Sequence, residues 1–181
     1  FRKMNFVRTT RVGHKENILA LDINTDGILS SVAEDGHCIL WSTDGQILHD
    51  INVNNEHGLT SDEYPLNSVT FNLSDGNGEI GLFQFQGKSS TCTERLKCHD
   101  SEVSQVYYFN FGSTERCLVS GGNDGKINIW KEIQTGKNVK YELYHKILHD
   151  SKINWITCSS FKKDCLFVAD QSSNVTVYEL K

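Results

Sequence analysis

The feature that most constrains this chain is a unit of sequence that occurs four times. Three copies begin at a histidine, continue through an apolar run, a loop and a second apolar run, pass a tight polar turn, and end on an aromatic residue. A weaker copy is GNGEIGLFQF. The closing aromatic residues are Trp41, Phe83, Trp130 and Tyr178. Their spacing of roughly 40 to 50 residues is typical of a small structural unit that buries its faces against neighbouring copies.

The apolar residues of the chain come in short runs, such as ILAL at 18–21 and VYYFNF at 106–111. These runs are rich in Ile, Val, Phe and Tyr, they are bounded by Gly, Asp, Asn and Ser, and they have little helical periodicity. Several are apolar at consecutive positions, which indicates strands covered on both faces. The pattern predicts an all-β chain of small stacked sheets.

Two copies carry the same four residues at the same spacing. Each has a His, then a Ser four residues before an Asp, then a Trp six residues after that Asp. The two sets are His14, Ser31, Asp35 and Trp41, and His99, Ser120, Asp124 and Trp130. The Asp-Gly pair in each copy indicates a tight turn between strands. We expect the indole N–H to donate to the Ser hydroxyl, the hydroxyl to the His, and the His to the carboxylate, so that every buried polar group has a partner.

The last copy departs from this set. It keeps His149 but has Val168, Ser172 and Tyr178 at the places of Ser, Asp and Trp. We therefore expect it to lack the hydrogen-bonded network. It would then depend on packing of the apolar residues Trp155, Phe167, Val175 and Val177.

The order Gly-His, Ser-x-x-x-Asp-Gly, Trp resembles the blade signature of the WD-repeat family. The resemblance implies an incomplete β-propeller of about four blades in a single domain over residues 4–181, with residues 1–3 of uncertain origin upstream of Met4. The blades are expected near 14–51, 65–97, 99–148 and 149–181. In this family the N-terminus supplies the missing strand of the last blade, which implies that residues 4–10 close it.

Residues 12–48 and 78–181 resemble one member of the family most closely, and that member carries several more blades between Leu48 and Gly78. Here the intervening segment supplies one predicted strand, LNSVTFNL, and a polar loop at 52–64. We interpret the chain as a shortened form or an incomplete gene model. It would be an open arc, a strained small ring, or a chain that needs a partner to cover exposed blade faces.

Two motifs suggest chemistry but are better explained by the fold. His14, Ser31 and Asp35 have the residue types of a catalytic triad, yet the trio recurs in a second copy with a Trp at fixed spacing, which favours a structural role. Residues 76–81 read GxGxxG, but a strand-like run follows instead of the helix that a dinucleotide site needs. We expect no catalytic residue, no cofactor and no metal ligand.

An alternative is an enzyme or a metal site in the central channel of a propeller. It would need clusters of His, Asp or Glu on the innermost strands. Those strands read ILALDI, VSQVYYF and INWITC, in which Asp22 is the only acidic residue and no histidine occurs.

Charge and hydropathy limit the class of partner. The net charge is -5 at pH 7, so the chain has no basic field for nucleic acid or an anionic membrane. No apolar stretch reaches the ~18 residues of a membrane span, and the first residues lack the apolar region of a signal peptide. The six cysteines form no CxxC pair, which indicates reduced core residues. We expect an intracellular protein, in the cytoplasm or the nucleus.

The resemblance implies a non-enzymatic scaffold whose loops present a mainly polar surface to partner proteins. Relatives act as substrate receptors of cullin-RING ubiquitin ligases, and their docking signature is Trp-Asp-x-Arg; the chain has WSTD at 41–44 and WKEI at 130–133 instead. A further alternative is a truncated form without stable function. The candidate partner-contact residues, in loops and turns, are Lys15, Glu16, Glu34, His37, Asp100, Glu102, Asn123 and Lys126.

Overall fold

The computed structural model confirms an all-β chain, an incomplete β-propeller of antiparallel sheets. It describes residues 9–23, 26–52, 66–69, 73–75, 78–86, 89–111, 115–136, 138–159 and 165–179. Every regular element in these residues is a strand, so this part of the chain contains no helix that could cross a membrane.

Four sheets follow one another along the chain, and we name them blades 1 to 4. Blade 1 contains β1 (Ile18–Ile23), β2 (Leu29–Ala33), β3 (His37–Trp41) and β4 (Ile47–Asn52). Blade 2 contains β5 (Leu66–Val69), β6 (Leu73–Asp75), β7 (Glu79–Gln86) and β8 (Ser89–Lys97). Blade 3 contains β9 (Val103–Phe111), β10 (Glu115–Gly122), β11 (Lys126–Thr135) and β12 (Asn138–Leu148). Blade 4 contains β13 (Ile153–Ser159), β14 (Cys165–Asp170) and β15 (Val175–Glu179).

Tight turns join the second and third strands of blades 1 and 3. Gly36 and Gly125 both have a φ of 71°, a left-handed conformation that glycine adopts without strain. The preceding aspartate fixes each turn, because Asp35 Oδ1 accepts the backbone N–H of His37 at 3.0 Å and Asp124 Oδ1 accepts that of Lys126 at 3.1 Å. Neighbouring strands are therefore paired as antiparallel hairpins throughout.

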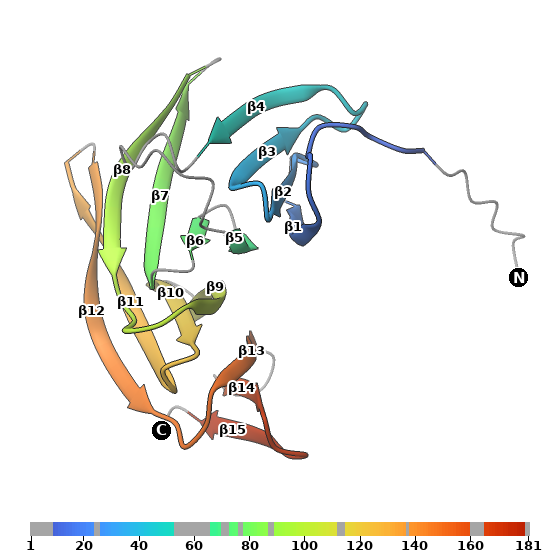
Figure 1. The fold of residues 1–181 in the computed structure, drawn as a ribbon. Helices are drawn as coiled ribbons and strands as arrows, with labels where there is room; N and C mark the ends of the chain where they lie inside the picture. Colours follow the sequence, from blue (N-terminus) through green and yellow to red (C-terminus); the bar gives the residue numbers. More distant parts are fainter. Residues whose placement is uncertain are drawn as a thin grey trace, which may run out of the picture.

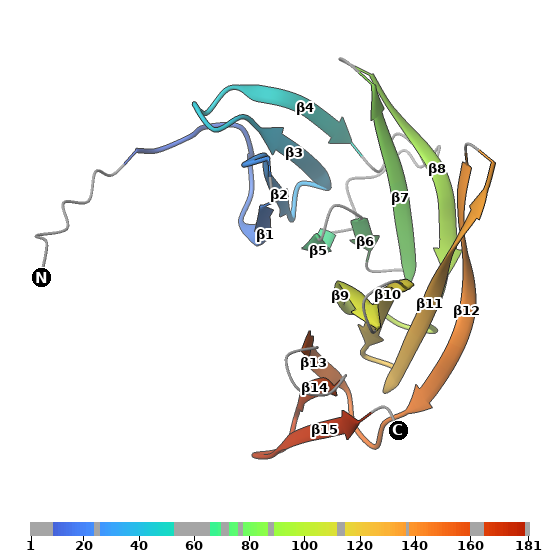
Figure 2. The ribbon, with the colours of Figure 1, turned by 180° about the vertical axis from the view of Figure 1, so that it is seen from behind.

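The blades are arranged along an open arc (Figure 1). The first strand of each blade lies on the inner side of the arc, and the last strand lies on the outer side. Figure 2 shows the same arrangement from behind. Blades 1 and 4 lie on opposite sides of the opening, so the described residues form an arc and not a small closed ring.

The core lies between the blades. One cluster joins β9 to β11 of blade 3 to β13 and β14 of blade 4 through residues such as Ile127, Ile153 and Ile156. A second joins blades 2 and 3, with Ile80 and Leu82 against residues of blade 3. Both faces of an inner blade are thus buried, which is why its strands are apolar at consecutive positions.

Two predictions about blade 2 have different outcomes. The segment LNSVTFNL at 66–73 was expected to be one strand, and this is wrong, because β5 and β6 pair with each other as a short hairpin in which Val69 lies opposite Leu73. The described part of the GxGxxG motif, 78–81, leads into a strand: Gly78 has a φ of 80° and β7 follows it directly. The helix N-terminus that would hold a pyrophosphate is therefore missing at this point.

Blade 4 also differs from expectation. Its buried core consists of Ile153, Ile156, Leu166 and Val168. Trp155, Val175 and Val177 are exposed, so the prediction that they form this core is wrong. The reason is that no blade among the described residues covers the side of the sheet on which they lie.

Several expectations at the ends and loops fall outside the described residues. Most of the predicted closing strand, 4–8, lies there, and Thr9 and Thr10 have no strand conformation. Blade 4 contains three strands among the described residues. Residues 53–64 of the predicted polar loop also lie outside them.

Candidate functional site

Blade 3 holds a chain of hydrogen bonds from its third strand to its turn. The Trp130 indole N–H faces Ser120 Oγ at 3.4 Å, Ser120 Oγ lies 2.9 Å from His99 Nε2, and His99 Nδ1 lies 2.9 Å from Asp124 Oδ1. An indole N–H only donates and a carboxylate only accepts, so the Ser hydroxyl donates to Nε2 and Nδ1–H donates to the aspartate. The chain therefore holds His99 as the Nδ1–H tautomer.

Blade 1 has the same arrangement. The Trp41 indole N–H donates to Ser31 Oγ at 2.8 Å, and Ser31 Oγ lies 2.7 Å from His14 Nε2. His14 Nδ1 lies 3.2 Å from Asp35 Oδ1. The four residues of each set thus meet in the order that their spacing predicts.

Both aspartates also hold the loop that precedes the first strand of their blade. Asp35 Oδ2 accepts the backbone N–H of Lys15 at 2.8 Å, and Asp124 Oδ2 accepts that of Asp100 at 3.0 Å. Burial raises the pKa of both carboxyls, but these backbone hydrogen bonds and the bonded histidines lower it, and the net pKa lies below the usual value. Each aspartate is therefore an ionised anchor for the loops above it.

A catalytic role for the His, Ser and Asp of each set meets a steric obstacle. A serine nucleophile must reach a substrate carbonyl, yet Ser31 and Ser120 are both buried beneath their tryptophans. Burial also lowers the pKa of His99, although Asp124 acts in the opposite direction. These groups are placed to hold two strands and a loop together.

The sequence analysis missed one member of the blade 3 network. Asn128 is fully buried on β11, where its Nδ2 donates to the carbonyl of Cys98 at 2.6 Å and lies 3.4 Å from His99 Nε2. Blade 1 has Ile39 at the corresponding position. The available signal was a polar residue between Ile127 and Ile129, in the apolar run that ends at Trp130.

Blade 4 has a network, which corrects the expectation that it would lack one. His149 Nδ1 lies 2.8 Å from the Tyr178 hydroxyl, and His149 Nε2 lies 2.8 Å from Asp170 Oδ2. The aligned position of the aspartate is Ser172, but Asp170 takes its role from two residues earlier and accepts the backbone N–H of Ser172 at 2.7 Å. These bonds lower the pKa of Asp170 to about 2, with the hydrogen bonds from Ser172 as the largest cause.

The candidate contact residues of blade 1 surround one hollow. Its volume is about 410 Å³ and its lining consists of Lys15, Glu16, Glu34, Asp35 and His37. Glu34 accepts a hydrogen bond from Asn17 at 2.9 Å, and His37 Nδ1 lies 2.6 Å from Asp50 Oδ1. The hollow is open, charged with both signs, and anchored from below by Asp35.

The candidate contact residues of blade 3 are instead paired with one another. Lys126 forms an ion pair with Asp100, and its Nζ lies 3.4 Å from Asp124 Oδ2. Asn123 Nδ2 donates to Glu102 Oε2 at 2.7 Å. The two loop surfaces therefore differ, since the lysine of blade 3 pairs with the carboxylates of Asp100 and Asp124.

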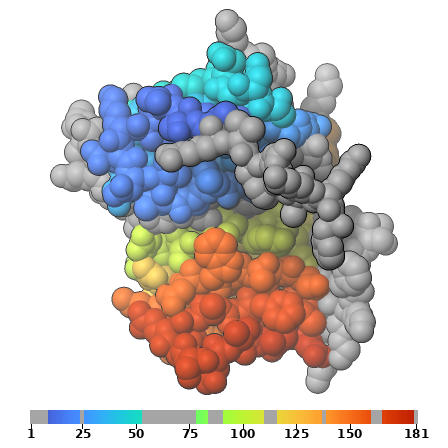
Figure 3. Space-filling view, turned by 90° about the vertical axis from the view of Figure 1, so that its right-hand side faces the viewer, coloured from blue at the N-terminus to red at the C-terminus, as the bar shows by residue number. Residues whose placement is uncertain are grey.

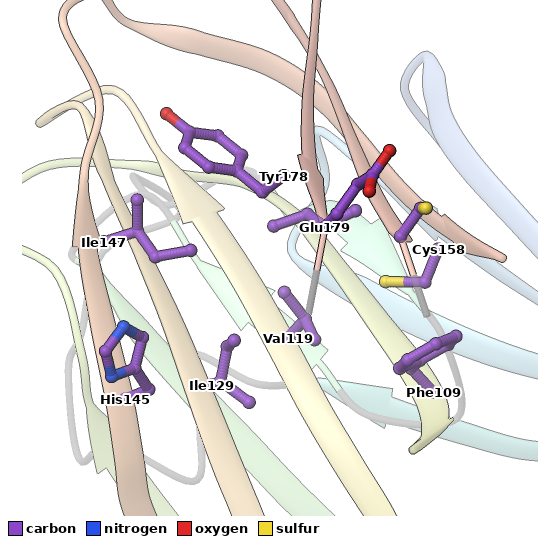
Figure 4. A pocket seen from close by; sticks show the side chains of 10 residues that line it. Phe109, Val119, Ile129, His145, Ile147, Cys158, Tyr178 and Glu179 are labelled. Atoms are coloured by element: carbon purple, nitrogen blue, oxygen red, sulfur yellow. The ribbon is translucent and has the colours of Figure 1, made fainter. Parts of the chain in front are cut away.

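A second cavity lies between blades 3 and 4 (Figure 4). Its volume is about 350 Å³, and apolar side chains such as Phe109, Val119 and Ile129 make up most of its wall. The titratable side chains in the wall are those of His145, Glu179, Tyr178, Cys158 and Cys165. Across the described part of the chain, no group of three or more His, Cys, Asp or Glu side chains is arranged to hold a metal ion.

Comparisons with known proteins agree with this geometry. The family model described as "WD domain, G-beta repeat" matches residues 5–42 and 90–131. The crystal structure of the computationally designed Ika4 protein is similar with a TM-score of 0.64 and 22% identity, over 98% of this chain and 100% of that one. The designed Ika8 protein is similar with a TM-score of 0.63 and 23% identity, over 94% of this chain and 48% of that one. The chain thus spans about half the length of Ika8, and likeness at these identities shows the fold alone.

Proposed function

We propose that this chain is a non-enzymatic scaffold that binds partner proteins through the loop surface of blade 1. WD repeats, which match two regions of the chain, generally mediate protein–protein interactions and are generally not enzymes. The observation that carries the proposal is the hollow around Lys15, Glu34 and His37. It is an exposed, mixed-charge surface that stands on a buried hydrogen-bonded base.

Such a base suits recognition because binding then orders few groups. The backbone next to Lys15 and the turn that carries His37 both bind the carboxylate of Asp35. Loops fixed in this way lose less conformational entropy when a partner binds. Charges of both signs around one hollow favour a partner surface that carries the complementary pattern.

We also propose a specific relative of this chain and a cellular role for its binding activity. The resemblance of residues 12–48 and 78–181 to WD repeat-containing protein 53 supports a shortened relative of that protein. A substrate-receptor role in a cullin-RING ubiquitin ligase, in the cytoplasm or nucleus, is the corresponding proposal. It rests on family resemblance, and the tetrapeptides that begin at Trp41 and Trp130 depart from the docking signature.

A charge-reversal experiment tests the binding surface. The pair Lys15→Glu with Glu34→Lys inverts the charges around the hollow and keeps the net charge. The pair Lys140→Glu with Glu142→Lys makes the same change on exposed positions of β12, away from the loops. Affinity purification with mass spectrometry on the full chain should lose its partners with the first pair and keep them with the second.

The double variant Asp35→Ala with Asp124→Ala serves as the unfolded control, because it removes both loop anchors. Partners that are recovered equally with the wild type, the loop pair and this control would contradict the proposal. Partners lost with the β12 pair alone would place the binding surface on the outer strands instead.

A further inference from the structure

The two end faces of the arc are exposed and apolar. Seen toward the open side, blade 1 lies above and blade 4 below, with the start of blade 3 between them (Figure 3). The inner blades have no such faces, because each is covered by the blade before it and the blade after it. The end faces can be compared position by position with the covered faces of blade 3.

The open face of blade 1 matches the face that blade 3 turns toward blade 2. Val103 and Val106, four and seven residues after His99, are each 0% exposed and pack in one cluster with Ile80 and Leu82. Ile18 and Leu21 stand four and seven residues after His14, but they are 52% and 61% exposed. Blade 1 therefore has the side chains of an inter-blade contact on a face that nothing in the described chain covers.

The open face of blade 4 matches the opposite face of blade 3. Ile127 and Ile129, three residues and one residue before Trp130, are 0% and 8% exposed because blade 4 covers them. Val175 and Val177 hold the same positions before Tyr178 and are 67% and 46% exposed. The two ends of the arc thus present the two complementary halves of one blade-to-blade contact.

We propose that a second copy of this chain covers both faces, with blade 4 of each copy packed on blade 1 of the other. Each contact repeats the packing of blade 3 on blade 4, and the two contacts are related by a two-fold axis. Head-to-tail contacts close into a ring when the rotation per subunit fits, and here two four-blade arcs would form one ring of eight blades. This inference does not depend on the loop surface of blade 1.

The length of the arc supports a second copy as the occupant. The chain covers 48% of Ika8, so the unmatched part of that chain is about as long as this one. Blades 1 to 4 follow each other without a gap in the arc, so any added blades must enter at the opening (Figure 1). A single added blade would leave another apolar face exposed, whereas a second arc covers both ends at once.

Light scattering coupled to gel filtration measures the assembly on the full chain. The expected mass is about 41 kDa, twice the 20.5 kDa of one chain. Leu21→Glu and Val175→Glu each place a charge in both contacts and should reduce the mass to that of one chain. Leu143→Glu, at a 47% exposed position on β12, is the matched control and should leave the dimer intact.

A mixing experiment distinguishes head-to-tail contacts from like-with-like contacts. The Leu21→Glu chain keeps an intact blade 4, and the Val175→Glu chain keeps an intact blade 1. A tagged Leu21→Glu chain should therefore retain untagged Val175→Glu chain, while neither variant retains its own kind. A wild-type chain that stays at 20.5 kDa at every concentration, or variants that fail to capture each other, would overturn the proposal.

Discussion

Blade 3 and blade 4 have the same order of strands and begin after equivalent histidines, but different parts of them are buried. Blade 3 is covered on both faces, and its His99 lies in a network with Ser120, Asp124 and Trp130. Blade 4 is covered on one face, and its His149 bonds to Asp170 and Tyr178 instead. The two blades should therefore contribute differently to the free energy of unfolding, even at positions where their residue types agree.

This difference teaches that the neighbours of a blade determine which of its residues form the core. Ile127 and Val175 are both β-branched, both lie at the start of the third strand, and both precede a closing aromatic residue by three positions. One is fully buried and the other is mostly exposed. The following blade is the cause, since its Ile153 and Ile156 pack in the same cluster as Ile127.

The largest expected effect comes from truncating these two residues. Ile127→Ala should lower the free energy of unfolding by about 2–5 kcal/mol, because it opens a cavity between two blades. Val175→Ala should change it by about 0.5 kcal/mol or less, because its side chain is exposed. Urea unfolding, at a protein concentration low enough for single copies, measures both.

Equal losses in the two variants would contradict the comparison. They would mean that the open face of blade 4 is covered in solution even when copies are dilute. Repeating the Val175→Ala measurement at high protein concentration sharpens the test. If a dimer buries Val175, the decrease in the free energy of unfolding will depend on protein concentration.

The second expected effect concerns the anchors of the two networks. Asp124→Ala removes the acceptor for His99 and for the backbone N–H groups of Asp100 and Lys126. It should cost about 2–3 kcal/mol, because the buried His99 is left without its acceptor and the loop loses its anchor. Asp170→Ala should cost less, since its loss leaves the histidine bonded to Tyr178 on a half-covered sheet. Thermal unfolding by circular dichroism orders the two variants, and the reverse order would contradict this account.

The sequence predicted these networks only where spacing is local and regular. The Ser-x-x-x-Asp-Gly order fixes a hairpin, and the hairpin brings Asp35 and Asp124 to their histidines. The turn of blade 4 is different: the alignment placed Ser172 at the position of the aspartate and predicted no network, whereas Asp170 bonds to the histidine. A spacing taken from the turns of blades 1 and 3 cannot predict an aspartate that lies two residues earlier in a different turn.

Properties that depend on distant residues could not be predicted in the same way. The exposure of Trp155 and Val175 depends on whether another blade covers their side of the sheet, and no local pattern reports this. The pairing of Lys126 with Asp100 joins loops that are far apart in the sequence. The four candidate contact residues of blade 1 line a common hollow, and this follows from the shape of the loops.

The third expected effect is a pH signature of the covered blade. Burial lowers the pKa of His99, with partial opposition from Asp124, so the unfolded chain binds a proton at this histidine more readily than the folded chain. The free energy of unfolding should therefore fall as the pH decreases from about 7 through the usual histidine pKa of about 6.5, and this contribution is constant above pH 7. His99→Gln should be less stable at pH 7 but lose less on acidification. Urea unfolding between pH 7 and pH 5 measures the slope, and equal slopes for both chains would contradict the assignment.

The smallest expected effect isolates the hydrogen bond that blade 4 has in place of the indole. Tyr178→Phe keeps the ring and removes the hydroxyl that lies 2.8 Å from His149 Nδ1. The loss should be about 0.5–1 kcal/mol, because the site is partly exposed and water replaces the lost partner. Tyr144→Phe, on the exposed outer strand β12, is the control and should have no measurable effect. A loss for Tyr178→Phe as large as that for Asp124→Ala would mean that blade 4 depends on its network as strongly as blade 3 does. In that case the missing neighbour could not be the main cause of the difference between the two blades.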